Sequence, residues 1–238
     1  MHRVSVDQIV WAAGESAVID GDEAHHALRV KRVRPGERIE LMDGRGGIAE
    51  GEVVEGDLGA KSRELHVRVT GVRREQPARP RVEIWTAVPK GGRVDEMIDQ
   101  LAQVGAAAWR PLDTARGVVD PREAKMERLG RIAVEASKQC GRAWRLEIGP
   151  KATMDEALRA APGVRVVVAD ASGSPWSGAE SSEHLRLLIG PEGGWTPEEL
   201  AAARTANASI SRFGPHVMRI ETAAVAACAM LVSVAASA

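Results

Sequence analysis

The sequence predicts an α/β protein of two domains, in which a small β-rich barrel precedes an open parallel sheet covered by helices. Three observations lead to this class. Residues 1–74 contain short alternating strands separated by turn sequences such as Arg34-Pro35-Gly36. Residues 81–238 alternate apolar runs with helical patterns, the order typical of parallel sheets. Between them, residues 75–80 are polar and hold two prolines, so we expect a linker.

The first domain is expected to contain four short strands and one helix. The strands cover residues 17–19, 38–41, 47–54 and 65–69. The helix is expected from about Glu23 to Val33, and basic residues gather where it ends. Short strands at this spacing favour a barrel.

The second domain is expected to begin with a strand at residues 82–88 and to continue with strands at 107–112, 164–169 and 186–189. An apolar stripe from Val94 to Ala102 predicts a helix, which Gly105 would end. Further helices are expected from Asp120 to about Cys140, from Thr153, and from Thr196. The apolar stretch 223–238 is short for a membrane span and is typical of a buried helix.

Residues 187–200 join a strand end, a glycine-rich turn and a helix start. Thr196, Pro197 and Glu199 fit the N-cap, first and third helical positions of a capping box. The glycines before them allow the backbone to approach a ligand at the carboxyl end of a strand. The spacing fits neither the dinucleotide-binding fingerprint nor the P-loop. On this stretch alone, a ligand site and an ordinary turn are equally compatible with the pattern.

A second stretch, residues 211–224, decides between these alternatives. The chain reads Gly190-Pro191-Glu192-Gly193-Gly194 and then Phe213-Gly214-x-x-x-Met218-Arg219-x-Glu221-Thr222-Ala223. This pair of motifs resembles the SPOUT methyltransferases, and most closely the RsmE family, which methylates N3 of a uridine in 16S ribosomal RNA. Supporting motifs are Arg29-Val30-x-Arg32 and Gln139-Cys140-Gly141-Arg142.

The resemblance implies a more specific fold than the pattern does. It implies an α/β SPOUT methyltransferase domain with a C-terminal trefoil knot over residues 81–238. It also implies a PUA-like β-barrel that binds RNA over residues 1–74, and a homodimer. General rules of chain connection would not predict a knot.

The resemblance further implies S-adenosylmethionine as cofactor, held mostly by backbone groups of three loops. The sulfonium of this cofactor already activates the methyl carbon, so no metal is expected. The residues implied to contact it are Ala169, Leu188, Ile189, Gly190, Glu192, Gly193, Gly194, Phe213, Gly214, Val217, Met218 and Thr222.

Two charged residues in the third motif are the candidate catalytic residues. Uracil N3 carries a proton, so an enzyme must remove the proton or stabilise the resulting anion. Glu221 could act as the base or could orient Arg219, which could stabilise charge on the uracil carbonyls. The alternative is an Arg–Glu pair that caps the last helix.

Any RNA-binding surface must be local, because the formal net charge of the chain is −1. Basic residues gather after the first helix and near the end of the helix that closes at Gly141. Both clusters are also compatible with solvated helix ends. The residues expected to contact 16S rRNA of the small ribosomal subunit are Arg3, Arg29, Lys31, Arg32, Lys138, Gln139, Arg142 and Arg145.

Composition excludes several other classes. Aromatic residues make up only 3% of the chain, so base stacking on Phe or Tyr is nearly unavailable. Two cysteines give no disulfide framework, which suits a reducing cytoplasm, and no secretory signal pattern is present. The six histidines show no metal-ligand spacing.

Two other functions stay open at this point. One is a SPOUT enzyme that methylates another RNA position, such as a ribose 2′-hydroxyl. The other is a catalytically inactive RNA-binding protein that kept the fold. The intact glycines and the presence of both Arg219 and Glu221 favour an enzyme.

Overall fold

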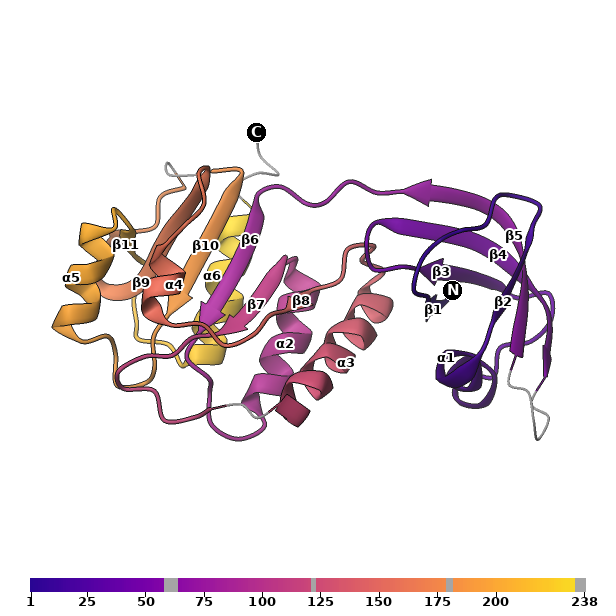
Figure 1. Cartoon of the computed structure of the whole chain (residues 1–238), viewed down its shortest axis with the longest axis horizontal. Coiled ribbons are helices and arrows are strands. Elements are labelled where there is room, and N and C mark those ends of the chain that lie inside the picture. Colours follow the sequence, from indigo (N-terminus) through magenta and orange to yellow (C-terminus); the bar gives the residue numbers. More distant parts are fainter. Residues whose placement is uncertain (58–63, 121–122, 179–181, 234–238) are drawn as a thin grey trace. The chain divides into compact units, whose positions relative to one another are not determined.

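The computed structural model describes residues 1–57, 64–120, 123–178 and 182–233 (Figure 1). The chain divides into two compact units. The first comprises Met1–Pro77 and Ser137–Arg145, and the second comprises Ala78–Ala136 and Leu146–Ala238. The sequence-based boundaries left residues 137–145 in the second domain. They pack with the first unit because Ala143 and Trp144 share a small core with Met42 and Ile48.

The first unit is a five-stranded sheet in the order β1-β3-β4-β5-β2. Its parallel pair is β1–β3, and the remaining pairs are antiparallel. Among the described residues the edge strands β1 and β2 do not pair with each other, so the predicted barrel is a sheet left open between them. The strands are β1 His2–Ser5, β2 Ser16–Ile19, β3 Arg38–Met42, β4 Gly47–Asp57 and β5 Glu64–Arg74.

The predicted helix of the first unit begins and ends earlier in the chain than the sequence indicated. It consists of α1, Gly21–His25, which continues as a π-helical segment η1, His26–Val30. It ends before Val33 because Arg32 has a φ of 51°, in the left-handed region that no helix continues through. Apolar side chains of the helix and the strands form one core.

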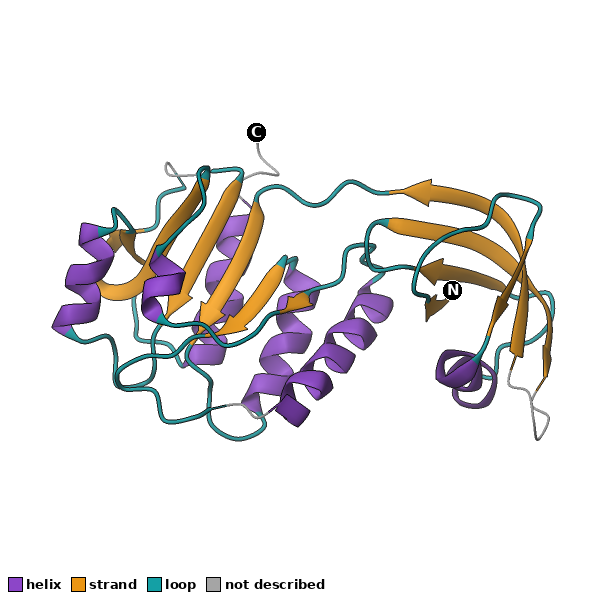
Figure 2. Cartoon of the chain, in the orientation of Figure 1, coloured by secondary structure: helices purple, strands orange, loops and turns teal. Residues whose placement is uncertain are grey.

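The second unit is built on a six-stranded sheet in the order β11-β9-β10-β6-β7-β8 (Figure 2). All of its strand pairs are parallel, which confirms the predicted parallel sheet. The sequence did not predict β8 and β11, which are short and lack an apolar run. The strands are β6 Arg81–Thr86, β7 Ala108–Pro111, β8 Glu147–Ile148, β9 Val164–Pro175, β10 His184–Ile189 and β11 Ser209–Arg212.

Helices cover both faces of this sheet, as the apolar strand runs predicted. On one face, Ile84 and Leu187 join the core that contains α2, Arg93–Val104; α3, Glu123–Cys140; and α6, Ile220–Ser233. On the other face, Trp85 and Leu188 join the core that contains α4, Met154–Leu158, and α5, Pro197–Thr205. Successive strand residues point to opposite faces, which explains this division.

The two predicted helix starts at threonine are confirmed. Thr153 and Glu156 form a capping box at α4, and Thr196 and Glu199 form one at α5. The second box fixes the start of α5 just after the glycine-rich turn.

Candidate active site

A cavity of about 420 Å³ opens at the carboxyl ends of β10 and β11 and beside the adjacent strand β9, at the point where β9 stops pairing with β10 after Ala169. Ligands of open α/β sheets bind at this edge. Three chain segments supply its walls: the residues after Val168, the glycine-rich turn after β10, and the segment from β11 to the start of α6. Its lining comprises Ala169, Asp170, Ala171, Ile189, Gly190, Pro191, Glu192, Gly194, Trp195, Arg212, Phe213, Gly214, His216, Val217, Met218, Arg219, Ile220, Ala223 and Ala227.

Most of the residues expected to contact a cofactor lie in this lining. They are Ala169, Ile189, Gly190, Glu192, Gly194, Phe213, Gly214, Val217 and Met218. Three others lie outside it. Leu188 packs in the core that contains α4 and α5. Gly193 lies beside Arg116, and Thr222 is exposed on α6.

The side chain of Trp195 packs against the glycine-rich turn and restricts which residues fit there. A Cβ added at Gly190 would lie 2.9 Å from Cε2 of Trp195, so no larger residue fits there without moving the ring. Gly194 has a φ of 70°, which other residues adopt only with strain. The indole Nε1 of Trp195 donates a hydrogen bond to the carbonyl of Ala169 at 3.0 Å. The ring therefore joins two of the three cavity walls.

An arginine from outside the three segments supports the same turn. Nη1 of Arg116 donates to the carbonyls of Gly193 at 2.7 Å and Trp195 at 3.4 Å. The backbone N–H of Ala115 donates to Oε1 of Glu199 at 2.9 Å. The loop after β7 thus holds both the turn and the helix start. Sequence reasoning missed this contribution because these residues lie 77 to 84 positions away along the chain.

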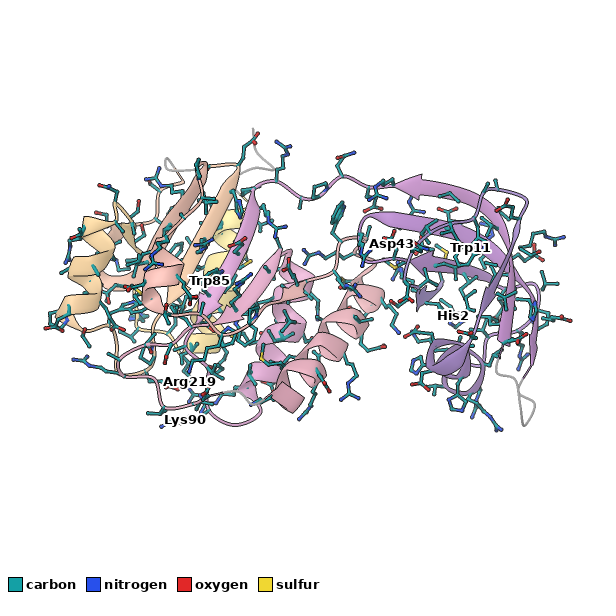
Figure 3. The ribbon with its side chains drawn as sticks, viewed as in Figure 1. His2, Trp11, Asp43, Trp85, Lys90 and Arg219 are labelled. Carbon is teal, nitrogen blue, oxygen red and sulfur yellow. The ribbon has the colours of Figure 1, made fainter. Side chains whose placement is uncertain are left out.

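The third wall carries the candidate Arg219. The ring of Phe213 stacks on Trp176 with centroids 5.5 Å apart, which anchors the beginning of this segment. Arg219 lines the cavity, and its carbonyl accepts a hydrogen bond from the N–H of Ala223 at 2.8 Å. Arg219 therefore stands at the start of α6. Figure 3 shows Arg219 and Lys90 at the end of the sheet to which the strand arrows point.

Glu221 is placed differently from what the sequence suggested. Its side chain is not in the cavity lining, and its Oε1 pairs with Nη1 of Arg93 at 3.4 Å. Its other oxygen, Oε2, is buried and has no hydrogen-bond partner among the described residues. The geometry therefore brings Glu221 together with Arg93 of α2, and not with Arg219.

Sequence reasoning also missed polar residues that do line the cavity, namely Asp170, Arg212 and His216. Asp170 directly follows the predicted strand 164–169, which was a usable signal. Its Oδ1 accepts hydrogen bonds from the backbone and the hydroxyl of Ser172, at 2.9 and 2.5 Å. Within the described residues, no three His, Cys, Asp or Glu side chains gather as a metal site would require.

Comparison with known proteins identifies the family. The model of an RNA methyltransferase domain matches residues 75–232, and that of an RNA methyltransferase PUA domain matches residues 19–61. A ribosomal RNA small subunit methyltransferase E from Mycobacterium bovis is 33% identical over 226 residues, which cover 90% of this chain and 85% of the relative. The chain belongs to the RsmE family.

Other RsmE proteins and solved structures agree with this. The Synechocystis RsmE is 28% identical over 237 residues, covering 96% of this chain and 75% of that protein. A probable rRNA methyltransferase from Porphyromonas gingivalis has a TM-score of 0.86 at 26% identity, with 100% and 99% of the two chains covered. An RsmE from Neisseria gonorrhoeae, solved with S-adenosyl methionine, has a TM-score of 0.87 at 24% identity, with 98% and 97% covered. The fold is that of SPOUT methyltransferases with a PUA-like domain.

Two of the residues expected to bind RNA have internal roles in this RsmE protein. The side chain of Lys138 is only 3% exposed, and its Nζ pairs with Glu23 at 2.8 Å. Arg3 binds Glu40 and also donates to the carbonyls of Lys138 and Gln139. The prediction that Lys138 contacts RNA conflicts with its burial, and Arg3 is occupied in holding the end of α3.

The other predicted RNA contacts are better placed for that role. Arg29 and Arg32 are exposed at the end of η1, and Lys31 between them is partly exposed. Gln139 and Arg145 are exposed, and Arg142 is partly exposed.

No helix in the described part of the chain is long and apolar enough to cross a membrane.

Proposed function

We propose that this protein transfers the methyl group of S-adenosylmethionine to N3 of a uridine in 16S rRNA of the small ribosomal subunit. The observation that carries the proposal is the cavity at the carboxyl ends of β10 and β11, beside Ala169 of β9, in a chain that belongs to the RsmE family. Relatives carry the name of small-subunit rRNA methyltransferases, and one was solved with this cofactor.

The residues present fit the cofactor. The cavity lining includes Gly190, where the absence of a Cβ leaves room beside Trp195, and Gly194, whose φ of 70° suits glycine. Asp170 and Glu192 add carboxylates that suit the amino and hydroxyl groups of the cofactor. When bound, S-adenosylmethionine supplies a methyl carbon already activated by the sulfonium.

Arg219 is the residue that we assign to charge stabilisation. Uracil N3 becomes nucleophilic as its proton leaves, and negative charge then spreads onto the neighbouring carbonyl oxygens. A guanidinium in the cavity lining can hydrogen-bond to that charge where it develops. Glu192 and His216 also line the cavity and are able to accept the proton.

Calorimetric titration with S-adenosylmethionine tests the cofactor site. Gly190→Ala would displace the ring of Trp195 and its bond to Ala169, so we expect affinity to fall about tenfold. The matched control is Gly130→Ala in α3, where a Cβ would meet nothing within 4 Å. Equal binding by Gly190→Ala and the wild type would exclude this cavity as the cofactor site.

The target base is tested by nucleoside analysis of small subunits from a strain that lacks the modification. N3-methyluridine in the treated rRNA is the expected product. A 2′-O-methylated nucleoside would instead support the alternative SPOUT activity. If the protein binds RNA but neither binds the cofactor nor forms a methylated product, it is the inactive RNA-binding protein.

We also propose that the protein works as a homodimer with a trefoil-knotted C-terminus, in the cytoplasm where small subunits are found. A face of α6 supports the dimer: after Glu221 the helix has no charged residue, and Ala229 and Met230 are exposed on it. A second copy of the chain would cover this apolar face. Sedimentation equilibrium should give twice the mass of the chain, and a single-chain mass would exclude the dimer.

A further inference from the structure

The start of α6 is connected to α2 by an ion pair that lies outside the cavity lining. Nη1 of Arg93 and Oε1 of Glu221 are 3.4 Å apart, with side chains 38% and 14% exposed. The two residues are separated by 128 positions in the sequence. Arg93 is the first residue of α2, and Glu221 is the second residue of α6.

The helical geometry of α6 explains why Glu221 is turned from the cavity. The α6 residues in the cavity lining are Ile220, Ala223 and Ala227, which share one face of the helix. Glu221 follows Ile220 by one residue and is therefore rotated about 100° from that face. That rotation brings it to the side of α6 that packs along α2. The Glu221 carboxylate therefore faces Arg93 and lies outside the lining that would meet a bound uracil.

Arg93 stands where local preference disfavours a cation. The N-terminal end of a helix carries partial positive charge, which favours acids in the first turn. Asp95 and Glu96 follow that rule in α2, and Glu221 follows it in α6. Arg93 does not, so its position is explained by the partner across the helix interface and not by α2 itself.

We propose that Glu221 is a positioning residue and not the base, and that it acts through Arg93. The pair fixes the start of α6 against α2. Arg219 begins the same helical turn, because its carbonyl accepts from the N–H of Ala223. Holding Glu221 therefore sets the direction in which Arg219 enters the cavity. This inference rests on the methyl transfer proposed above.

A double-mutant cycle on kcat of rRNA methylation tests the proposal. We expect Arg93→Gln and Glu221→Gln to lower kcat by a similar factor, about tenfold, because a misplaced Arg219 stabilises charge less well. We expect the double variant to be no slower than either single variant, since both remove the same pair. Arg93→Lys, which keeps the charge, should restore most of the rate.

The matched control is Arg128→Gln. Arg128 of α3 pairs with Asp95 in the same first turn of α2, at 2.6 Å, but that pair does not involve α6. The control should leave kcat and cofactor affinity unchanged. If Arg128→Gln lost as much rate as Arg93→Gln, the Arg93–Glu221 pair would only stabilise α2 in general. That result would overturn the proposal.

The base assignment makes the opposite prediction. If Glu221 removes the N3 proton, Glu221→Gln should lose about 10²- to 10⁴-fold while Arg93→Gln stays near the wild-type rate. Such asymmetry would overturn the positioning role. A failure of the proposed methyl transfer can be told apart from a failure of the positioning role, because in the first case the wild type itself would give no product. Coupling between the two variants in melting temperature would still report whether the pair fixes α6 to α2.

Discussion

Lys138 and Arg29 show how residues of the same charge in one predicted RNA surface acquire different roles. Both were expected to bind RNA because they lie in basic clusters. The structure buries the Lys138 side chain against Glu23 and leaves Arg29 exposed. Charge is visible in the sequence, but burial depends on the contact of residues 115 positions apart.

Lys138→Ala should therefore lower stability more than it lowers RNA binding. Removing Nζ leaves the Glu23 carboxylate without its cation, and we expect a loss of about 1–3 kcal/mol in the free energy of unfolding. Arg29→Ala should change the free energy of unfolding by less than about 0.5 kcal/mol. It should also lower the slope of log affinity against log salt concentration by about 1, the loss expected for one phosphate contact. Chemical denaturation and filter binding at several salt concentrations measure the two effects. The reverse pattern would return Lys138 to the RNA surface.

The glycine-rich turn and α5 form the element on which the proposed cofactor site depends most directly. The N-cap Thr196 stands two residues after Gly194 and forms a capping box with Glu199, whose carboxylate also accepts a hydrogen bond from the N–H of Ala115. The sequence predicted the box because its residue types and spacing are local. It could not predict the loop after β7 that also holds this helix start, because that contact is long-range.

Thr196→Ala should lower both stability and cofactor affinity. Loss of the cap costs about 1 kcal/mol of stability, and a frayed start of α5 loosens the turn, so we expect affinity to fall up to about fivefold. Thr153→Ala removes the same type of box from α4, whose residues are not in the cavity lining. It should cost similar stability without changing affinity. Thermal unfolding and calorimetry with S-adenosylmethionine separate the two variants, and equal affinity losses would contradict the assigned role of α5.

At the scale of the whole molecule, each compact unit contains a carboxylate that is held ionised by arginine. Burial alone raises the pKa of Glu40 in the first unit, but hydrogen bonds and charges from Arg3 and Arg73 outweigh it, so the pKa lies below its ordinary 4.5. In the second unit, burial likewise raises the pKa of Glu83, and Arg186 and His184 outweigh it and lower that pKa.

Both groups should make the protein sensitive to acid. A pKa lower in the folded than in the unfolded state means that the unfolded chain binds protons first as the pH falls. The stability from these groups is therefore complete above about pH 4.5 and is lost as the pH falls through the folded pKa values. Glu40→Gln and Glu83→Gln should each give lower stability at pH 7 and a flatter dependence between pH 3 and 5. Denaturation at a series of pH values measures this, and an unchanged slope in both variants would refute it.

The sequence by itself determined the two-domain order, the alternation of helices with most strands of the parallel sheet, and the two helix starts capped by threonine. It also holds the two motifs whose family resemblance predicts a cofactor site at Gly190 and Phe213. These features depend on residue type and spacing along a few turns of chain. Only the tertiary structure decided that Lys138 is buried, that Glu221 faces Arg93, and that Asp170 and His216 line the cavity. Each of these depends on which distant segments pack together, and local periodicity carries no information about that.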